Sequence, residues 1–269
     1  MVPKNRTIEE GSNFFSLRYT PLVKFAKKSL GQNFLTDPEI RDGILEAAGD
    51  IKGKNILEIG PGLGFLTSKL LSSGANLTAV ELDDRAVVRL QNDFGHMDHF
   101  RLIPGDILDQ DLDVMFEQKN YSIIANIPYN ITAPILRKTL SSTKNKPDFM
   151  LLMVQKEVAQ KLVAKKRSIL SISVEIFAEA EICFLVGREC FNPVPGVDSA
   201  IIKITTRKEP LVSAEDEKKF FQVVNRAFKE KRKKLSNTLP AEWLEGIDAN
   251  LRPEVLDIDD WLKITKNAA

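Results

Sequence analysis

The tetrapeptide Asn126-Ile127-Pro128-Tyr129 places an amide, a proline and an aromatic ring directly after the apolar run 121–125. The Asn126 side chain can accept one hydrogen of a planar amine. The main-chain carbonyl of Ile127, aimed by the fixed φ of Pro128, can accept the other. Tyr129 offers a flat face on which a base can stack. The pattern indicates methylation of an exocyclic amine, and an ordinary proline turn after a strand is the alternative interpretation.

A glycine-rich turn points to a nucleoside cofactor. Gly60, Gly62 and Gly64 follow the apolar run 55–59, and Glu81 ends the next such run. Glycines let a ligand approach the backbone closely, and an acid at the end of a second strand can accept hydrogen bonds from ribose hydroxyls. The spacing is G-x-G-x-G rather than the G-x-G-x-x-G of dinucleotide sites. A sulfonium nucleoside fits this turn, and a nicotinamide-dependent oxidoreductase is the alternative.

Two further residues extend the expected cofactor site. Asp106 follows a third apolar run, 100–103, where its carboxylate can accept a hydrogen bond from an adenine amine, and Ile107 can flank the ring. The full set of expected cofactor contacts from these segments is Gly60, Gly62, Glu81, Leu82, Asp106, Ile107 and Asn126.

The elements that must position these residues alternate between strand and helix patterns from about Asp37 to Thr205, which predicts an α/β fold built from βαβ units. The expected strands cover 55–59, 76–80, 100–103, 121–125 and 150–154. Expected helices cover 65–71, 83–94 and a segment that begins at about Lys156. The runs 182–186 and 200–205, joined through the loop 191–197, predict a closing hairpin with an antiparallel edge.

The pattern changes to helix alone after Pro210, with no further β-branched run. We therefore divide the chain into a catalytic, cofactor-binding domain with an N-terminal extension, residues 1–208, and a small all-α domain, residues 209–269. Phe220, Val223 and Ala227 have helical spacing and predict a packed apolar stripe in the second domain. Its basic face is the candidate RNA contact.

Composition limits the classes of protein to consider. With 269 residues, 43% of them hydrophobic, the chain can form one large α/β domain and a smaller appendage. No apolar run is long enough to cross a bilayer, so we expect a cytoplasmic protein without a membrane partner. Cys183 and Cys190 lack CxxC spacing, and His96 and His99 have no suitably spaced third ligand. We therefore expect no metal site.

The formal net charge of +1 conceals three local concentrations of basic residues, around 24–28, 156–167 and 226–234. A solvated helix face is the ordinary explanation of any single block. Three blocks beside a base-binding motif favour a surface that contacts nucleic-acid phosphates. The predicted nucleic-acid contacts are Lys156, Arg167, Lys229, Lys231, Arg232 and Lys233.

Taken in order, Glu58–Gly64, Glu81, Gly105-Asp106 and Asn126–Tyr129 resemble the S-adenosylmethionine-dependent methyltransferases of the ribosomal RNA adenine dimethyltransferase family. Four more segments are similar to the family: 28–35, 155–159, the F-x-P-x-P-x-V-x-S stretch 191–199, and 228–237. The resemblance implies a class I methyltransferase fold, in which a Rossmann-like, mostly parallel seven-stranded sheet carries a small C-terminal all-α domain.

The resemblance also assigns roles. It implies S-adenosyl-L-methionine as the cofactor, with Asn33 and Leu35 over its methionine end. Asn126, Ile127, Pro128 and Tyr129 become the catalytic set, and Phe191 holds the target base opposite the tyrosine. A core-filling side chain is the alternative for Phe191. Two departures concern Arg167-Ser168, where many members show Tyr-Gly, and Ala125, where Gly often stands.

The implied function is N6,N6-dimethylation of two adjacent adenines near the 3′ end of small-subunit ribosomal RNA, in ribosome biogenesis. The segment 228–237 is more similar to this housekeeping branch than to the branch that confers macrolide resistance on the large subunit. That second branch and a non-catalytic RNA-binding assembly factor are the alternatives. The expected partner is small-subunit ribosomal RNA in an assembling subunit, and the expected state is a monomer.

Overall fold

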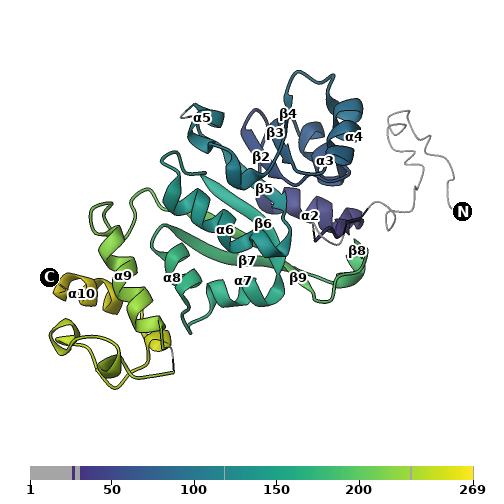
Figure 1. Cartoon of the computed structure of the whole chain (residues 1–269). Coiled ribbons are helices and arrows are strands. Elements are labelled where there is room, and N and C mark those ends of the chain that lie inside the picture. Colours follow the sequence, from purple (N-terminus) through teal and green to yellow (C-terminus); the bar gives the residue numbers. More distant parts are fainter. Residues whose placement is uncertain (1–25, 28–30, 118, 231, 269) are drawn as a thin grey trace, which may run out of the picture.

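A computed structural model of the chain describes residues 26–27, 31–117, 119–230 and 232–268 (Figure 1). Within these residues the central sheet has seven strands in the order β4-β3-β2-β5-β6-β9-β7. Neighbouring strands from β4 to β6 are parallel, whereas β9 is antiparallel to both β6 and β7. The strands are β2 (Asn55–Ile59), β3 (Asn76–Glu81), β4 (Phe100–Pro104), β5 (Ser122–Asn126), β6 (Phe149–Gln155), β7 (Ala178–Val186) and β9 (Ser199–Thr206). The expectation of a mostly parallel seven-stranded sheet is confirmed.

The closing strands differ from a simple hairpin in one respect. β7 and β9 do pair antiparallel, as their sequence predicts, but β9 lies between β6 and β7. The edge strand is therefore β7. Their connection contains a short helical turn, η5 (Arg188–Cys190), and the strand β8 (Phe191–Asn192). A strand that returns from β7 without a crossover helix must run antiparallel to it, and β9 pairs with the otherwise open side of β6.

Helices cover both faces of the sheet, and each strand therefore contributes to two apolar layers. Ile123 and Ala125 belong to one buried cluster, whereas Ile124 between them belongs to the other. Successive strand residues point to opposite faces, so a strand that is covered on both sides reads as a continuous apolar run. The helices are α2 (Pro38–Ala48), α3 (Phe65–Ser72), α4 (Asp84–Phe94), α5 (Leu112–Phe116), α6 (Thr132–Arg137), α7 (Lys156–Val163), α8 (Ile169–Glu175), α9 (Glu217–Phe228) and α10 (Ile258–Asn267).

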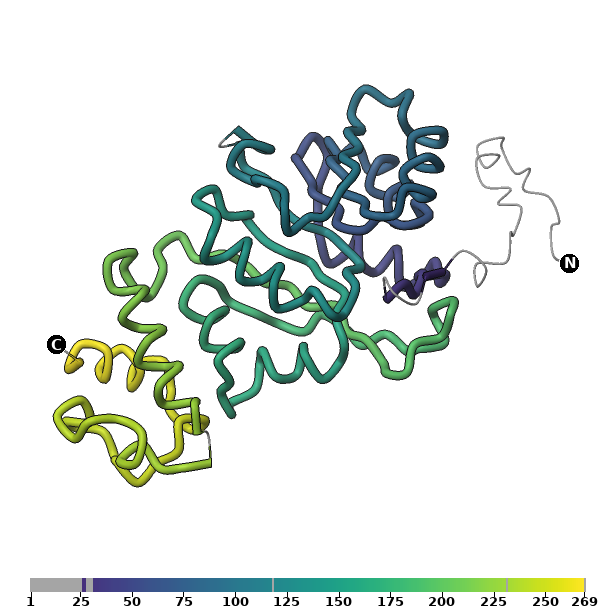
Figure 2. The backbone as a smooth tube through the Cα atoms, viewed as in Figure 1, coloured from purple at the N-terminus to yellow at the C-terminus, as the bar shows by residue number. Residues whose placement is uncertain are grey.

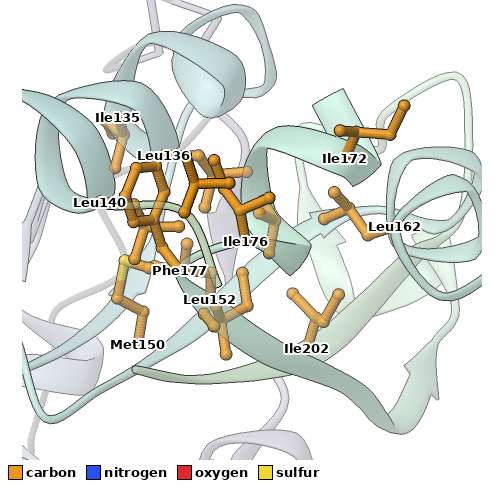
Figure 3. Close-up of a cluster of buried hydrophobic side chains, with 14 of the residues drawn as sticks. Ile135, Leu136, Leu140, Met150, Leu152, Leu162, Ile172, Ile176, Phe177 and Ile202 are labelled. Atoms are coloured by element: carbon orange, nitrogen blue, oxygen red, sulfur yellow. The ribbon is translucent and has the colours of Figure 1, made fainter. Parts of the chain in front are cut away.

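Figure 3 shows the larger of these layers, in which α6, α7 and α8 pack on the sheet. Leu136 from α6, Leu162 from α7 and Ile172 from α8 lie over Met150, Leu152 and Ile202 of the strands. Together these side chains exclude water from one face of the sheet. This burial holds β5 and β6, and hence the turn that follows β5, in a fixed position.

A second, two-stranded sheet joins distant parts of the chain. β1 (Phe34–Leu35) pairs antiparallel with β8, so that Phe34 lies opposite Asn192 and Leu35 opposite Phe191. Figure 2 shows the start of the described chain, in purple, beside the green segment that contains β8. This pairing brings the expected N-terminal cofactor segment and the loop with Phe191 to the same side of the molecule.

Beyond β9 the described chain forms helices and turns only, and α9 and α10 lie at the far end of the molecule from α4 (Figure 1). Phe220 and Val224 of α9 and Trp261 of α10 are buried in the same continuous cluster as the α8 residue Ile172. The helical unit thus packs directly on the catalytic unit. The domain boundary between 208 and 209 stays a prediction. In the part of the chain that the structure describes, no helix is long and apolar enough to cross a membrane.

Candidate active site

The parallel strands bring the predicted site residues to one edge of the sheet. Glu81 is the last residue of β3 and lies in register with Pro104, the last residue of β4, directly before Gly105-Asp106. Asn126 is the last residue of β5, and the glycine turn follows β2, which lies between β3 and β5. The carboxyl edge of a parallel sheet is where such folds bind their ligands. Segments that are far apart in sequence therefore form one site.

Glu81 fastens the glycine turn to the end of β3. Its carboxylate accepts hydrogen bonds from the N–H of Gly62 at 2.9 Å and from the N–H of Asp83 at 2.8 Å. Burial raises the pKa of Glu81, and the hydrogen bonds from these N–H groups act in the opposite direction. Gly62 has φ +57°, and a Cβ atom there would lie 3.0 Å from the Phe34 ring. The turn thus needs glycine for its backbone conformation and for its contact with β1.

A second acid, Glu58, is buried beneath this turn. It is 1% exposed, and one carboxyl oxygen accepts a hydrogen bond from the Thr67 hydroxyl at 2.7 Å. Burial raises the pKa of Glu58 to about 8, because the charged form loses its hydration inside the protein. Glu58 is therefore a neutral acid at neutral pH and does not add a second negative charge beside Glu81.

This raised pKa predicts a pH dependence of stability. Between the ordinary value of 4.5 and the folded value of about 8, the unfolded chain has lost the Glu58 proton while the folded chain keeps it. The folded state then binds more protons, so the free energy of unfolding falls as pH rises, by at most ~1.4 kcal/mol per pH unit. Glu58→Gln has no proton to lose, and its side-chain oxygen can still accept the hydrogen bond from the Thr67 hydroxyl. We expect its free energy of unfolding to fall less steeply with pH. Urea unfolding of both proteins at about pH 6, 7 and 8 gives the free energy of unfolding at each pH. An equal change with pH in the two proteins would contradict the prediction.

The Asn126 side chain is held by the N-terminal segment. Its Nδ2 donates a hydrogen bond to the main-chain carbonyl of Asn33 at 3.4 Å. This contact leaves Oδ1 as an acceptor, and no donor from the described residues engages it. The Ile127 carbonyl also accepts no hydrogen bond from the described chain, and Pro128 holds φ at −56° in the turn. Two acceptors that no donor of the described residues engages therefore follow each other at the end of β5.

Tyr129 is held by the first residue of β9. Its hydroxyl lies 2.7 Å from the Ser199 hydroxyl, and Ser199 is fully buried at the start of β9. Burial raises the pKa of Tyr129, and the hydrogen bond with Ser199 acts in the opposite direction. The phenol is therefore neutral at physiological pH, and the bond fixes the orientation of its ring. Ser199 belongs to the F-x-P-x-P-x-V-x-S segment, although sequence reasoning gave it no role.

The bond between Tyr129 and Ser199 can be tested by deletion from either side. We expect Ser199→Ala and Tyr129→Phe each to lower kcat for methyl transfer by about 3- to 10-fold, the worth of one lost hydrogen bond. The double variant should be no worse than either single variant, because both remove the same bond. Steady-state kinetics with all three proteins checks this. Fully additive losses would show that the two hydroxyls act separately.

The residues expected around the adenosine part of the cofactor lie at the ends of β3 and β4. Asp106 uses Oδ1 to accept a hydrogen bond from the N–H of Leu108 at 2.8 Å, and this contact caps the short helix that follows. Ile107 is buried, whereas Leu82 is 53% exposed beside Glu81. An apolar side chain with this exposure can cover one face of a purine ring. These contacts stay predictions.

The N-terminal segment is joined to the same edge through an acid that sequence reasoning missed. Asp83 is buried, and its carboxylate accepts hydrogen bonds from Arg85 and from Gln32 and also pairs with Lys27. These contacts, that with Arg85 foremost, lower the pKa of Asp83 well below its ordinary value. Asp83 is two residues from Glu81 in the sequence, and this proximity to a predicted cofactor acid was the available signal.

Asn33 and Leu35, which the family resemblance assigns to the methionine end of the cofactor, flank Phe34 in the sequence, and the Phe34 ring lies against Gly62. Asn33 contributes its main-chain carbonyl to Asn126, and Leu35 is buried. Phe191, opposite Leu35 in the β1–β8 pair, is 2% exposed and belongs to the buried cluster around Leu35. Its ring is packed as the core-filling interpretation describes. Base holding by Phe191 stays a prediction that requires the loop to rearrange.

The predicted RNA contacts differ in how freely they are presented. Lys229, Arg232 and Lys233 are exposed at the end of α9 and beyond it, whereas Lys156 is partly buried at the start of α7. Lys231 lies outside the described residues. Two of the predicted contacts pair with acids: the Arg167 guanidinium lies 2.9 Å from the Glu175 carboxylate within the catalytic unit, and the Lys233 ammonium pairs with the Glu230 carboxylate.

The donor set at this edge suits a cationic nucleoside without a phosphate. The edge combines a turn of positive-φ glycines with a buried acid at the end of β3. The sequence predicts no phosphate-binding group at the start of α3. A sequence profile for ribosomal RNA adenine dimethylases matches residues 23–269. The chain belongs to the ribosomal RNA adenine dimethylase family. It is therefore an RNA adenine dimethyltransferase that uses S-adenosylmethionine as methyl donor.

Individual relatives agree with this membership of the ribosomal RNA adenine dimethylase family. The chain is 37% identical over 263 residues to the ribosomal RNA small subunit methyltransferase A of Enterococcus faecalis, with 89% of each chain covered. A dimethyladenosine transferase from Plasmodium falciparum has a similar structure, with a TM-score of 0.74 and 27% identity over 87% of this chain and 98% of that one. The 23S rRNA methyltransferase ErmE shares the fold, with a TM-score of 0.72 and 24% identity, over 87% of this chain and 99% of that one.

Proposed function

We propose that the chain dimethylates the N6 amines of two adjacent adenines near the 3′ end of small-subunit ribosomal RNA during ribosome biogenesis. The observation that carries this proposal is a pair of acceptors, Asn126 Oδ1 and the Ile127 carbonyl, that accept no hydrogen bond from the described part of the chain. They lie at the edge that also carries the glycine turn. Two neighbouring acceptors match the two hydrogens of an exocyclic amine. Tyr129 adds a neutral aromatic ring beside them.

The mechanism follows from what these residues can do. The amine lone pair of adenine is delocalised into the ring, which makes the amine a poor nucleophile. Acceptance of its hydrogens by Asn126 and Ile127 localises electron density on nitrogen and stabilises the positive charge that develops during transfer. Positioning of the amine contributes most of the remaining rate enhancement. The residues that would hold S-adenosylmethionine are Gly60, Gly62, Glu81, Leu82, Asp106 and Ile107, and its sulfonium supplies an electrophilic methyl group.

No side chain has to act as a general base in this scheme. The methylated nitrogen is cationic and strongly acidic, so its proton can pass to water or to a nearby acceptor. After the first methylation the amine retains one hydrogen for Asn126 or Ile127, and the site must accommodate the methyl group in place of the other. Dimethylation is the activity of the family to which the chain belongs.

The small-subunit substrate is proposed from two observations. The relative from Enterococcus faecalis, which is named as a small-subunit ribosomal RNA methyltransferase, aligns with 89% of this chain. In addition, the exposed cations Lys229, Arg232 and Lys233 form a surface that can contact RNA phosphates. We propose a cytoplasmic enzyme that acts as a monomer on an assembling subunit. The alternatives are a large-subunit methyltransferase of the macrolide-resistance type and a non-catalytic assembly factor.

The test uses the purified chain, tritiated S-adenosylmethionine and small subunits that lack the modification. We expect label in two adjacent adenines near the 3′ end of the small-subunit RNA, with two methyl groups on each. Label in large-subunit RNA would instead support the resistance branch. If the wild-type protein and Asn126→Ala both incorporate nothing while RNA binding persists, the assembly-factor alternative is correct.

A further inference from the structure

The loop between α7 and α8 makes polar contacts with the C-terminal helical unit. The main-chain N–H of Arg167 donates a hydrogen bond to the Glu254 carbonyl at 2.7 Å. The Lys166 ammonium lies 2.8 Å from the Glu254 carboxylate, and the side chains are 67% and 20% exposed, respectively. Glu254 belongs to the short helix η8 (Pro253–Val255), which contacts α9. One residue of the helical unit is thus held by two successive residues of the catalytic unit.

The catalytic side of this contact is rigid. The Arg167 guanidinium lies 2.9 Å from the Glu175 carboxylate and donates a second hydrogen bond to the Ala164 carbonyl at 3.2 Å. Ser168 caps α8 through a reciprocal pair of hydrogen bonds with Ser171. The loop is therefore fixed to both flanking helices. Its Arg167-Ser168 pair is also the position at which this chain departs from the Tyr-Gly of many family members.

We propose that Lys166, Arg167 and Glu254 form an interdomain latch that positions the basic surface of Lys229, Arg232 and Lys233 relative to the active site. In this role Lys166 acts through Glu254 and does not contact an RNA phosphate. The consequence for RNA rests on the function proposed above. The latch itself rests on the contacts between the two units.

A latch has a physical reason, because much of the contact between the two units is apolar packing. The Ser141 hydroxyl donates a hydrogen bond to the Glu217 carboxylate at the start of α9, and the N–H of Leu211 donates to the Ile176 carbonyl. Beyond the start of α9, α8 and α9 share a continuous apolar cluster, and apolar packing is not directional. Interfaces between domains therefore permit relative motion unless they are large. A main-chain hydrogen bond and an ion pair on the same residue fix the orientation of η8. Because η8 contacts α9, that orientation also sets the direction in which the basic end of α9 faces.

Charge reversal separates the latch from a direct electrostatic role, because the two predict opposite signs. Glu254→Lys removes a negative charge and adds a positive one, which strengthens RNA binding if charge alone matters. The latch predicts weaker binding, by about 2- to 5-fold, since an exposed ion pair changes an equilibrium by no more than about that factor. Glu242→Lys makes the same charge change at an exposed residue of the same unit, in the short helix η7 (Ala241–Leu244), and we expect it to tighten binding.

The reciprocal exchange provides the rescue. Lys166→Glu alone should weaken binding, and Lys166→Glu combined with Glu254→Lys should restore the wild-type affinity by forming the pair in reverse. The dissociation constant for small subunits lacking the modification is the first measurement. In steady-state kinetics we expect the two single variants to raise KM and to keep kcat at saturating subunits within about 2-fold of wild type. Tighter binding by Glu254→Lys, or a double variant equal to the sum of its single variants, would overturn the latch.

A measurement without RNA keeps this proposal separate from the proposed function. Hydrogen exchange at the Arg167 amide reports the bond to the Glu254 carbonyl in the free protein. We expect exchange to be faster in Glu254→Lys, by about 3-fold or more, and to return to the wild-type rate in the double variant. Failure of RNA methylation together with this pattern would reject the function and retain the latch. Unchanged exchange in every variant would reject the latch alone.

Discussion

Asn126→Ala is expected to lower kcat for methyl transfer by about 10²- to 10³-fold, the loss that follows removal of one positioned group that stabilises transition-state charge. Asn126 Oδ1 is one of two acceptors at the end of β5 that no donor within residues 31–117, 119–230 and 232–268 engages, and its orientation is set by the bond from Nδ2 to the Asn33 carbonyl. Alanine removes the acceptor and leaves the Ile127 carbonyl to act alone. Single-turnover methylation of small subunits with saturating S-adenosylmethionine measures the chemical step.

Asn130→Ala is the matched control for this experiment. Asn130 is an exposed asparagine on the same turn, four residues further along the chain, and its truncation should leave kcat within about 2-fold of wild type. Because the Asn126 amide also contacts the N-terminal segment, the cofactor dissociation constant of each variant should be measured separately. An Asn126→Ala enzyme with wild-type kcat would show that the end of β5 does not hold the target amine.

Glu81→Ala should weaken S-adenosylmethionine binding by about 10- to 100-fold, which corresponds to one hydrogen bond with a charged group. The buried carboxylate of Glu81 fixes the glycine turn through the N–H of Gly62 and is the acceptor expected for the ribose hydroxyls. Alanine therefore removes a ligand contact and also loosens the turn. Isothermal titration with S-adenosylhomocysteine, which lacks the reactive methyl group, measures binding without turnover.

Asp84→Ala provides the comparison, since Asp84 is an exposed acid three residues away, and we expect it to bind cofactor as the wild type does. The raised pKa of Glu81 adds a pH signature. Its ionised fraction begins to fall at a higher pH than that of an ordinary glutamate, so wild-type affinity should decline on acidification earlier than a normal carboxylate would predict. The Glu81→Ala protein should lack that decline. If its affinity matches that of the wild type, Glu81 is not a cofactor ligand.

Much of the architecture could be predicted because its causes are local. Each strand from β2 to β6 is an apolar run within about a residue or two of its predicted bounds. β2 to β5 end at polar or glycine-containing turns, whereas α7 follows β6 directly. Asp83, predicted at the start of a helix, caps α4 through its side chain. The position of β9 between β6 and β7 could not be predicted in this way. The order of strands in a sheet depends on which strands pair, and that pairing does not change the hydrophobic periodicity of either strand.

The same distinction applies to the site. Asn126, Glu81 and the glycines could be proposed as site residues because an alternating α/β pattern shows which residues follow the strand ends. Ser199 and Asp83 were missed because their roles depend on partners distant in sequence, Tyr129 and Gln32. The basic block around Arg167 predicts an RNA contact, and only the structure shows that its guanidinium pairs with Glu175. The positions of charged residues along a chain do not reveal which of them form ion pairs in the folded protein.

By itself, the sequence determined the fold class, the family and the segments that carry the chemistry, since these depend on periodicity and on the order of short motifs. Only the tertiary structure decided which atoms are free to act. It showed Asn126 oriented by Asn33, Tyr129 held by Ser199 and Phe191 buried against Leu35. It also showed two residues of a basic loop engaged with Glu254 of the helical unit. The reason is physical: hydrogen bonds and burial are properties of pairs in space, and the folded chain forms those pairs from residues up to 150 or more positions apart.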